Sequence, residues 1–163
     1  MFLKMKVFGL TIDPFTNVPI VILKDHDEKN ALPVWIGVLE ASAIASELEK
    51  VRFSRPMTHD LLKEILKNLS VTVNKIEVND LKDNVYYATI HMTGKDGSDF
   101  TLDARPSDAI ALALRMNSNI FVDSSVLEKS KSIDMRGEGK KSGKDFLDSL
   151  EDISPGEFGK YKM

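Results

Sequence analysis

The sequence predicts a domain of the α+β class, with a mixed and largely antiparallel sheet packed with two or three helices rich in alanine and leucine. Short stretches rich in Val, Ile and Phe come in pairs separated by turn residues, which is typical of β-hairpins. Residues 59–69 have helical apolar spacing, and residues 106–116 are apolar nearly all round. The 163 residues suffice for one core, which we place in residues 1–133.

The first part of the chain predicts three strands followed by a helix. Residues 2–12 and 18–24 are rich in large apolar residues, and residues 13–17 between them carry the Pro and Asn of a turn, so they predict a β-hairpin. A third strand is expected at residues 32–36. Residues 40–50 are rich in alanine, which favours a helix whose backbone lies close to a neighbouring element.

The next predicted helix, over residues 59–69, is amphipathic. Its apolar residues recur at intervals of three and four, and charged and amide residues occupy the opposite face. Thr58 precedes it as the expected N-cap, whose hydroxyl would accept a hydrogen bond from a backbone N–H of the first turn.

The second half of the domain predicts a hairpin and one central helix. Residues 71–78 predict a strand whose apolar parity changes near Asn74, which favours a β-bulge there. Residues 86–93 alternate apolar and polar side chains, and a Gly-Lys-Asp-Gly turn joins them to a partner strand at 99–104. The apolar helix at 106–116 is expected at the centre of the domain. The remaining predicted elements are a strand at 119–122 and a helix from residue 126 to about residue 131.

Residues 134–163 differ in composition from the body of the chain. They begin with a polar, glycine-rich run that predicts a linker. Phe146, Leu150 and Ile153 then share one helical face, which leaves two interpretations open. One is a short helix that docks on the body or on a neighbouring subunit, and the other is a weakly ordered acidic tail.

Composition excludes several classes of protein. The chain has no cysteine, which excludes disulfide frameworks, thiol nucleophiles and thiolate metal sites. No apolar run reaches the roughly 18 residues that cross a bilayer, and lysines interrupt the first residues before a signal-peptide core could form. A cytoplasmic location without a membrane partner is therefore expected. The net charge of -3 is not the basic balance typical of proteins held on nucleic acid by phosphate contacts, although a local basic patch is compatible with it.

Two of the predicted helices begin with similar polar segments. Residues 55–60 read Arg-Pro-Met-Thr-His-Asp and residues 105–108 read Arg-Pro-Ser-Asp, so each helix start combines an arginine, a proline, a hydroxyl residue and an aspartate. The free N–H groups of a helix start and an adjacent guanidinium can bind an anion. The candidate phosphate-binding residues are Arg55, Arg105, Thr58 and Ser107. Because the two segments are alike, we expect the two helix starts to lie close together and to serve a common pocket.

The alternative for both segments is ordinary capping and internal ion pairing. Ser, Thr and Asp are common at helix starts, where they satisfy backbone N–H groups. Arg105 would then pair with Asp60, Asp103 or Glu40. Both interpretations remain open from the sequence alone.

His59 is the histidine best placed for acid–base chemistry, because a neighbouring aspartate can orient an imidazole and raise its basicity. The candidate catalytic residues are His59, Asp60, Asp108 and Arg105. Carboxylate oxygens also suit Mg²⁺ or Mn²⁺. The candidate ligands of such an ion are Glu40, Asp60, Asp103 and Asp108, and their convergence depends on the fold.

The sequence contains none of the common phosphate-loop, nucleophile-elbow, zinc-helix or dinucleotide-binding motifs. Asp80-Leu81-Lys82 has the D-x-K form of some metal-dependent nuclease sites. The asparagines and the aspartate around this run also fit a turn, so a structural role is the alternative.

Three segments resemble the bifunctional nuclease domain family in their residues, order and spacing. They are Leu-Pro-Val-Trp-Ile-Gly at 32–37 followed by Glu40, Arg-Pro-Met-Thr-His-Asp-Leu-Leu at 55–62, and Asp-Ala-Arg-Pro-Ser-Asp-Ala-Ile-Ala-Leu-Ala at 103–113. The resemblance covers about residues 1–130, and Lys50 stands where it leads us to expect a glycine. It implies a fold particular to this family and the hydrolysis of DNA and RNA, an activity associated chiefly with plant members.

The expected function is therefore hydrolysis of phosphodiester bonds in DNA or RNA, dependent on a divalent metal ion. The competing hypothesis is a non-catalytic regulatory homo-oligomer that binds an anion or a partner at the arginine-bearing helix starts. A homo-oligomer, most simply a dimer, is expected because alanine-rich helices, hairpin edges and an apolar tail segment suit self-association.

Overall fold

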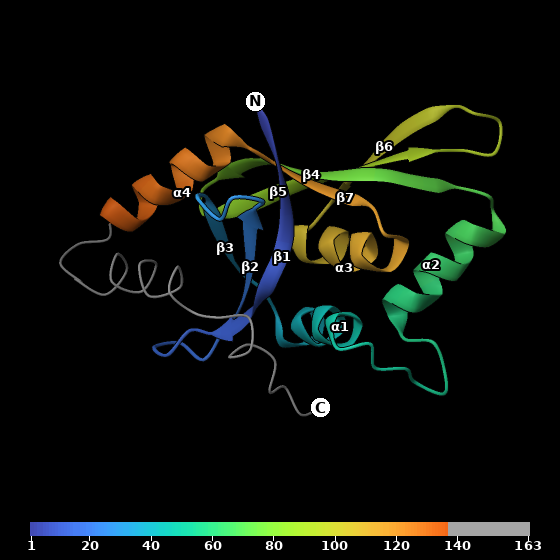
Figure 1. The fold of residues 1–163 in the computed structure, drawn as a ribbon, viewed down its shortest axis with the longest axis horizontal. Helices are drawn as coiled ribbons and strands as arrows, with labels where there is room; N and C mark the ends of the chain where they lie inside the picture. Colours follow the sequence, from blue (N-terminus) through green and yellow to red (C-terminus); the bar gives the residue numbers. More distant parts are fainter. Residues whose placement is uncertain (137–163) are drawn as a thin grey trace.

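The computed structural model describes residues 1–136, which form a seven-stranded mixed sheet and four helices (Figure 1). The strand order is β3-β2-β1-β7-β4-β5-β6, and β4–β7 is the parallel pair among antiparallel ones. The predicted α+β class is thus confirmed. The elements are β1 (Phe2–Ile12), β2 (Pro19–Asp25), β3 (Ala31–Trp35), α1 (Val38–Leu48), α2 (Thr58–Asn68), β4 (Thr72–Lys82), β5 (Val85–Thr93), β6 (Asp99–Ala104), α3 (Pro106–Met116), β7 (Asn119–Asp123) and α4 (Ser124–Arg136).

The predicted boundary after residue 133 falls inside α4, which continues to Arg136. The rest of the predicted linker and tail, residues 137–163, lies outside the described residues. In the described part of the chain, no helix combines the length and apolarity needed to cross a membrane.

Local turn chemistry explains most of the strand pairing. β1 and β2 form the predicted hairpin, and β5 pairs with β6 as predicted. Asp83 and Asn84 join β4 to β5 with φ values of 49° and 62°, the paired positive angles of a two-residue type I′ turn. The register of β4 against β5 shifts between Val73 and Lys75, so the β-bulge predicted at Asn74 is confirmed.

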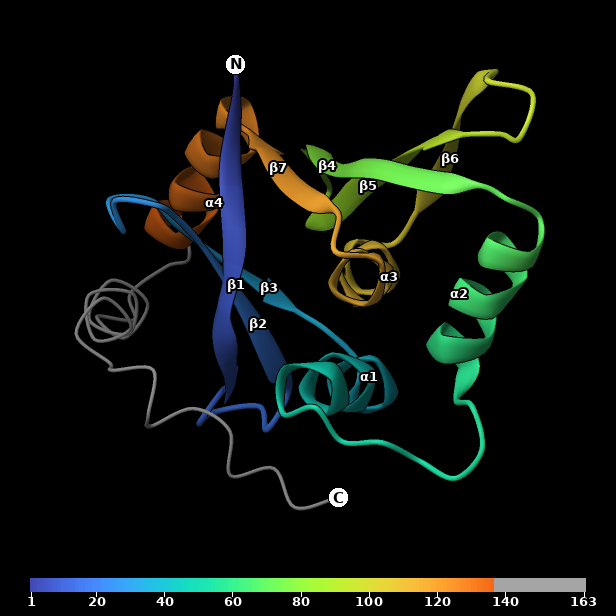
Figure 2. The ribbon, with the colours of Figure 1, turned by 45° about the vertical axis from the view of Figure 1, so that its right-hand side comes forward.

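β7 connects the two halves of the sheet. It lies between β1 and β4, where Ile120 is the cross-strand neighbour of Met5 on one side and of Ile76 on the other. The strand itself was predicted from the sequence, but its place in the sheet was not. Figure 2 shows that the β1-β2-β3 half and the β7-β4-β5-β6 half turn sharply relative to each other.

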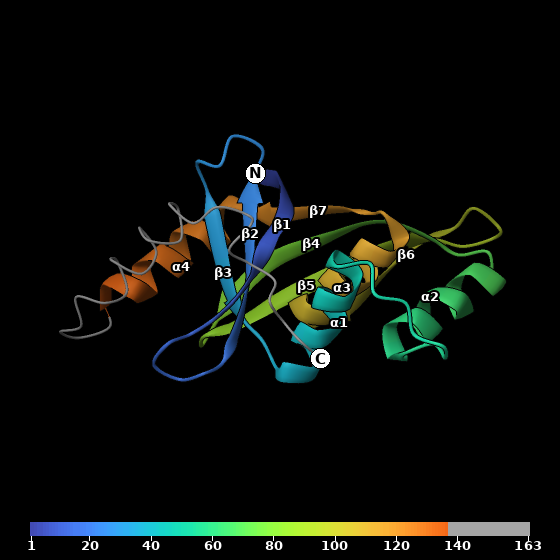
Figure 3. The same cartoon turned by 60° about the horizontal axis from the view of Figure 1, so that its bottom comes forward.

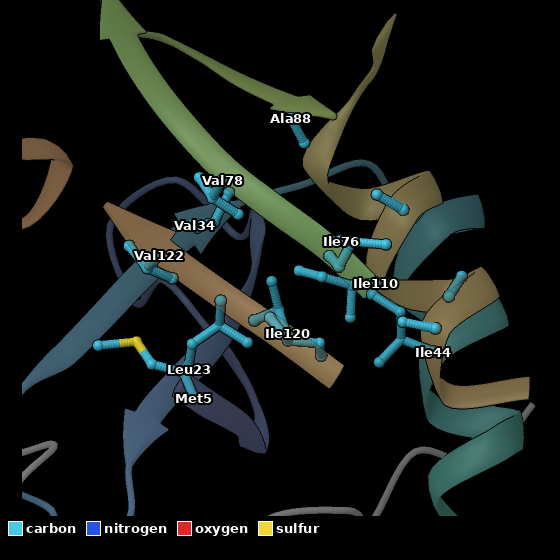
Figure 4. Close-up of a cluster of buried hydrophobic side chains, with 14 of the residues drawn as sticks. Met5, Leu23, Val34, Ile44, Ile76, Val78, Ala88, Ile110, Ile120 and Val122 are labelled. Atoms are coloured by element: carbon cyan, nitrogen blue, oxygen red, sulfur yellow. The ribbon is translucent and has the colours of Figure 1, made fainter. Parts of the chain in front are cut away.

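The core lies inside this curved sheet. Side chains from strands far apart in the sequence meet there, among them Val34 of β3 and Val78 of β4 (Figure 4). α1 and α3 lie side by side beneath the sheet (Figure 3), and Ile44 and Ile110 pack between them and the strands. Most of α3 is buried, as its all-round apolar pattern predicts. Truncating Ile110 to alanine would cost about 2–5 kcal/mol.

α2 is the predicted amphipathic helix, but none of its residues is buried. The prediction that Thr58 is the N-cap was wrong, because the helix begins at Thr58 and Met57 is the capping residue. The Met57 N–H donates to Asp60 Oδ2 at 3.2 Å, so the aspartate carboxylate takes the capping role expected of the threonine hydroxyl. Thr58 is exposed.

Candidate functional site

The starts of α2 and α3 lie against each other, as their similar sequences suggested. His59 Nε2 on α2 is 3.0 Å from Asp108 Oδ1 on α3. The backbone explains part of this placement. Arg105 is extended, with φ -68° and ψ 142°, as the residue before a proline prefers, and Pro106 opens α3 at a position where no N–H is needed.

Arg105 extends this contact to α1. Its Nε is 2.7 Å from Asp108 Oδ2, and its Nη1 is 2.8 Å from Glu40 Oε1. The predicted pairing of Arg105 with Glu40 is therefore confirmed, and Asp108 is an additional partner. We call Glu40, Arg105, Asp108 and His59 the His59 network. Because the Glu40 carboxylate folds back over Gly37, a side chain at position 37 would collide with it.

The electrostatics of the network favour an ionised Asp108. Burial raises the pKa of this carboxyl, but the hydrogen bonds from Arg105 and His59 together outweigh burial. The pKa of Asp108 therefore lies below its ordinary value. The bonds to Asp108 and Glu40 raise the pKa of Arg105. An ionised carboxylate only accepts hydrogen bonds, so His59 Nε2 carries the shared proton. The other ring nitrogen, Nδ1, has no hydrogen-bond partner among the described residues.

The network lies at the surface. The side chain of Arg105 is 64% exposed and that of Asp108 is 32% exposed, whereas His59 is 14% exposed. The guanidinium is thus open to an anion from solvent, and the less exposed imidazole, bound to the same Asp108, is held in a more restricted environment. This arrangement can bind a phosphate and exchange a proton beside it.

Asp60 is not part of the His59 network, although the sequence placed it beside His59. Its Oδ1 accepts a 2.7 Å bond from Arg115 Nε. Arg115 is 4% exposed and also donates to the carbonyls of Ala43 and Ala111. Burial raises the pKa of Asp60, but the hydrogen bond from Arg115 outweighs it and the net pKa is lowered. This pair therefore links α1, α2 and α3 as a structural element.

Arg115 was missed by the sequence reasoning. It is a charged residue within the otherwise apolar run of α3, which is the signal that could have identified a buried ion pair. A hollow of about 260 Å³ borders this pair, with Arg52, Pro56 and Lys63 among its lining residues.

The other candidate residues occupy different environments. Asp103 lies on β6 with an exposed side chain, and Arg55 is exposed in the segment between α1 and α2. Neither makes an ion pair with another side chain that the structure describes. Ser107 is 6% exposed, and its hydroxyl makes no hydrogen bond to a described residue.

The four carboxylates proposed as metal ligands do not gather at one point. Among the described side chains, no group of three or more His, Cys, Asp or Glu residues is placed to hold a metal ion. The D-x-K run lies at the end of β4, where Asp80 binds Lys82 at 2.9 Å and Lys129 at 2.7 Å. These bonds lower the pKa of Asp80.

Comparison with known proteins gives matches that contain this region. The bifunctional nuclease domain family matches residues 21–134, which include the whole His59 network. An uncharacterized protein of Mycobacterium tuberculosis is 30% identical over 95% of this chain and 97% of its own length. Bifunctional nuclease 1 of Oryza sativa subsp. indica is 24% identical over 63% of this chain and 32% of its own length. Bifunctional nuclease 2 of Oryza sativa subsp. japonica is 26% identical over 72% of this chain and 37% of its own length.

Proposed function

Because the chain belongs to the bifunctional nuclease domain family, we propose that it hydrolyses phosphodiester bonds in DNA, RNA or both, and that the reaction takes place at the His59 network. The observation that carries this proposal is the 3.0 Å contact between His59 Nε2 and Asp108 Oδ1. A histidine oriented by an ionised carboxylate is suited to act as a general base or acid.

In the proposed reaction His59 accepts a proton through Nδ1. A water molecule loses this proton as its oxygen forms a bond to phosphorus, and the bond from phosphorus to the leaving oxygen breaks. The leaving oxygen takes a proton from solvent. Asp108 fixes the ring and stabilises the imidazolium that forms. General acid–base catalysis by a side chain positioned in this way typically raises the reaction rate about 10²–10⁴-fold.

Arg105 is the proposed phosphate-binding residue of the same reaction. Its Nε and Nη1 bind carboxylates, whereas Nη2 has no hydrogen bond to any described residue. The guanidinium therefore has a donor left for a phosphate oxygen, and the nearby start of α3 adds its N–H groups. The exposed Arg55 would provide a second cation along the bound strand.

Dependence on Mg²⁺ or Mn²⁺ is part of the proposal. Mg²⁺ commonly uses only one or two protein carboxylates and completes its shell with water and substrate phosphates. Glu40 and Asp108 are the carboxylates nearest to the proposed phosphate, but both bind Arg105. Arg105 binds Glu40 at Oε1 and Asp108 at Oδ2, so an ion at either of these two oxygens would displace the guanidinium, and we route no step of the reaction through a metal.

A cleavage assay tests the proposal. Purified protein is incubated with end-labelled single-stranded DNA and RNA, with Mg²⁺ or Mn²⁺ and with chelator. We expect cleavage that chelator abolishes, and slower cleavage after Arg105→Lys, because lysine keeps the charge but lacks the planar fork. Absence of cleavage with either metal would contradict the proposed function.

One observation favours a second candidate, a non-catalytic homo-oligomer that binds an anion or a partner. Arg105 already binds two carboxylates, and Asp60 binds the buried Arg115. These ion pairs are the ones expected of a network with a purely structural role. In that case the exposed guanidiniums would bind an anion or a carboxylate of a partner without turnover. Binding without cleavage in the assay above would support this function.

Self-association is proposed for either function. Apolar side chains on one side of α2 and at its C-cap are exposed: Leu61 is 51% exposed, Ile65 is 46% exposed and Leu69 is 62% exposed. A second copy of the chain, related by a two-fold axis, would cover this stripe with the same stripe. Location in the cytoplasm belongs to the same proposal, and the absence of cysteine supports it.

A further inference from the structure

The face of β7, β4, β5 and β6 that points away from the core carries a hollow of about 630 Å³. α1, α2 and α3 all lie on the other side of these strands (Figures 1 and 2). Directly paired residues of neighbouring strands point to the same side of a sheet, so one row of this face runs from Asn119 through Lys75 and His91 to Thr101. Asn74 and Phe121 also line the hollow.

A buried carboxylate organises this hollow. Glu77 is 8% exposed, and its two oxygens bind Lys75 Nζ at 2.5 Å and His91 Nε2 at 2.8 Å. Burial raises the pKa of Glu77, but the hydrogen bonds from Lys75 and His91 outweigh it and the net pKa is lowered. The carboxylate therefore stays ionised and fixes a lysine and a histidine at the edge of the hollow.

An aromatic ring lies beside these polar groups. Phe121 of β7 is half-buried, and Lys75 Nζ is 5.7 Å from the centre of its ring. On the other side of β7, the exposed Lys4 of β1 is the cross-strand neighbour of Phe121. The ring thus lies between two lysines, with the amides of Asn74 and Asn119 within the same hollow.

We propose that this face binds single-stranded nucleic acid, with a base against Phe121 and phosphates at Lys75 and Lys4. Single strands are bound by aromatic side chains that stack on bases, by cations along the backbone and by amides at the base edges. An inorganic anion would not use the ring, and an apolar ligand would not use the amides and cations. The volume also falls within the range of small-molecule sites, about 300–1,000 Å³.

The position of the face relative to the His59 network fits this ligand. β6 contributes Thr101 to the hollow and leads four residues later to Arg105 at the start of α3. At about 3.3 Å per residue, an extended chain of that length spans about 13 Å. A strand held on the sheet could therefore continue over β6 to the arginine. This inference rests on the proposed nuclease function and adds the surface that would hold its substrate.

Fluorescence anisotropy with a short labelled oligothymidine and a short labelled oligouridine tests the inference, with Mg²⁺ and again with chelator. Phe121→Leu keeps an apolar side chain but removes the ring, and we expect it to weaken binding about 5- to 100-fold. Lys75→Gln should weaken binding and reduce its salt dependence. Phe15→Leu, at a ring that is 72% exposed in the β1–β2 turn, is the matched control and should bind as the wild type.

The outcomes separate the two claims. If the wild-type protein binds and cleaves while Phe121→Leu and Lys75→Gln bind equally well, the sheet face is not the binding surface and the proposed function stands. If the wild-type protein cleaves nucleic acid but binds neither oligonucleotide, the inference is wrong and the proposed function stands; if it neither binds nor cleaves, both claims are wrong. Circular dichroism of each variant shows whether it keeps the fold, and Phe121→Tyr, which retains a ring, should restore binding if stacking is the cause.

Discussion

His59 and Asp108 are 49 positions apart in the chain, yet their side chains meet at 3.0 Å between the first turns of α2 and α3. α3 is fixed by its buried residues, whereas α2 has none. The position of His59 therefore depends on the partly buried Leu66, which packs against the core, and on two polar links to α3, namely this contact and the bond between Asp60 and Arg115. Each link predicts a different consequence when it is removed.

Asp60→Asn should reduce stability, whereas Asp108→Asn should reduce activity. Asp60→Asn leaves the buried Arg115 without its carboxylate, and we expect the free energy of unfolding to fall by about 2 kcal/mol. Asp108 is partly exposed and its ion pair is at the surface, so its loss should cost less than about 1 kcal/mol. Urea denaturation and the cleavage assay measure the two effects. Equal destabilisation by both substitutions would show that Asp108 is also structural.

Acid should weaken the fold through Asp60. Its folded pKa lies below the unfolded value of about 3.9, because the Arg115 hydrogen bond outweighs the effect of burial. The ionised Asp60 therefore makes its full contribution to the unfolding free energy above about pH 4, and this contribution is lost as the pH falls through the folded pKa. The difference in unfolding free energy between the wild type and Asp60→Asn should shrink below pH 4. A difference that stays constant down to pH 2 would contradict this assignment.

Lys50 provides a separate test of the backbone. Its φ is 55°, in the left-handed region that glycine tolerates best, which agrees with the glycine expected there from the family resemblance. Lys50→Gly should therefore stabilise the protein, by up to about 1 kcal/mol. Thermal denaturation measures this change. Lys95→Gly, at an exposed turn residue without a positive φ, is the control and should not stabilise.

The exposed stripe of α2 predicts an oligomer that a charge would disrupt. Ile65→Lys should convert the assembly to the 18.2 kDa monomer in light scattering, because a buried lysine without a partner opposes association. Val85→Lys, at an apolar residue of β5 that is 53% exposed, is the matched control and should leave the mass unchanged. A wild-type protein that is monomeric at micromolar concentration would contradict self-association.

Local sequence signals predicted most of the elements and part of the site. The period of α2, the apolar run of α3 and the bulge at Asn74 each follow from a few consecutive residues. The similar starts of the two helices also predicted that they lie close together, which the contact between His59 and Asp108 confirms. The pairing of Arg105 with Glu40 was among the sequence-based alternatives, because both residues lie in segments with recognisable polar patterns.

The remaining contacts depend on long-range packing that local patterns do not encode. The insertion of β7 between β1 and β4 sets which strands become neighbours, and hence brings Lys4 next to Phe121. The pairing of Asp60 with Arg115 depends on how α2 lies against α3, because the two residues are 55 positions apart. The contact between His91 and Glu77 is also long-range, because it depends on the register of β4 against β5.

The most direct measurement of the central claim compares His59→Asn with His26→Asn in the cleavage assay. His26 is a surface histidine whose side chain is 100% exposed, so its replacement controls for loss of a histidine in general. We predict that His59→Asn lowers the rate of cleavage of single-stranded DNA or RNA at least about 100-fold, the low end of general acid–base contributions, while the fold and oligonucleotide binding are retained. His26→Asn should cleave at the wild-type rate. Cleavage by His59→Asn at the wild-type rate would contradict the assignment of the His59 network as the active site.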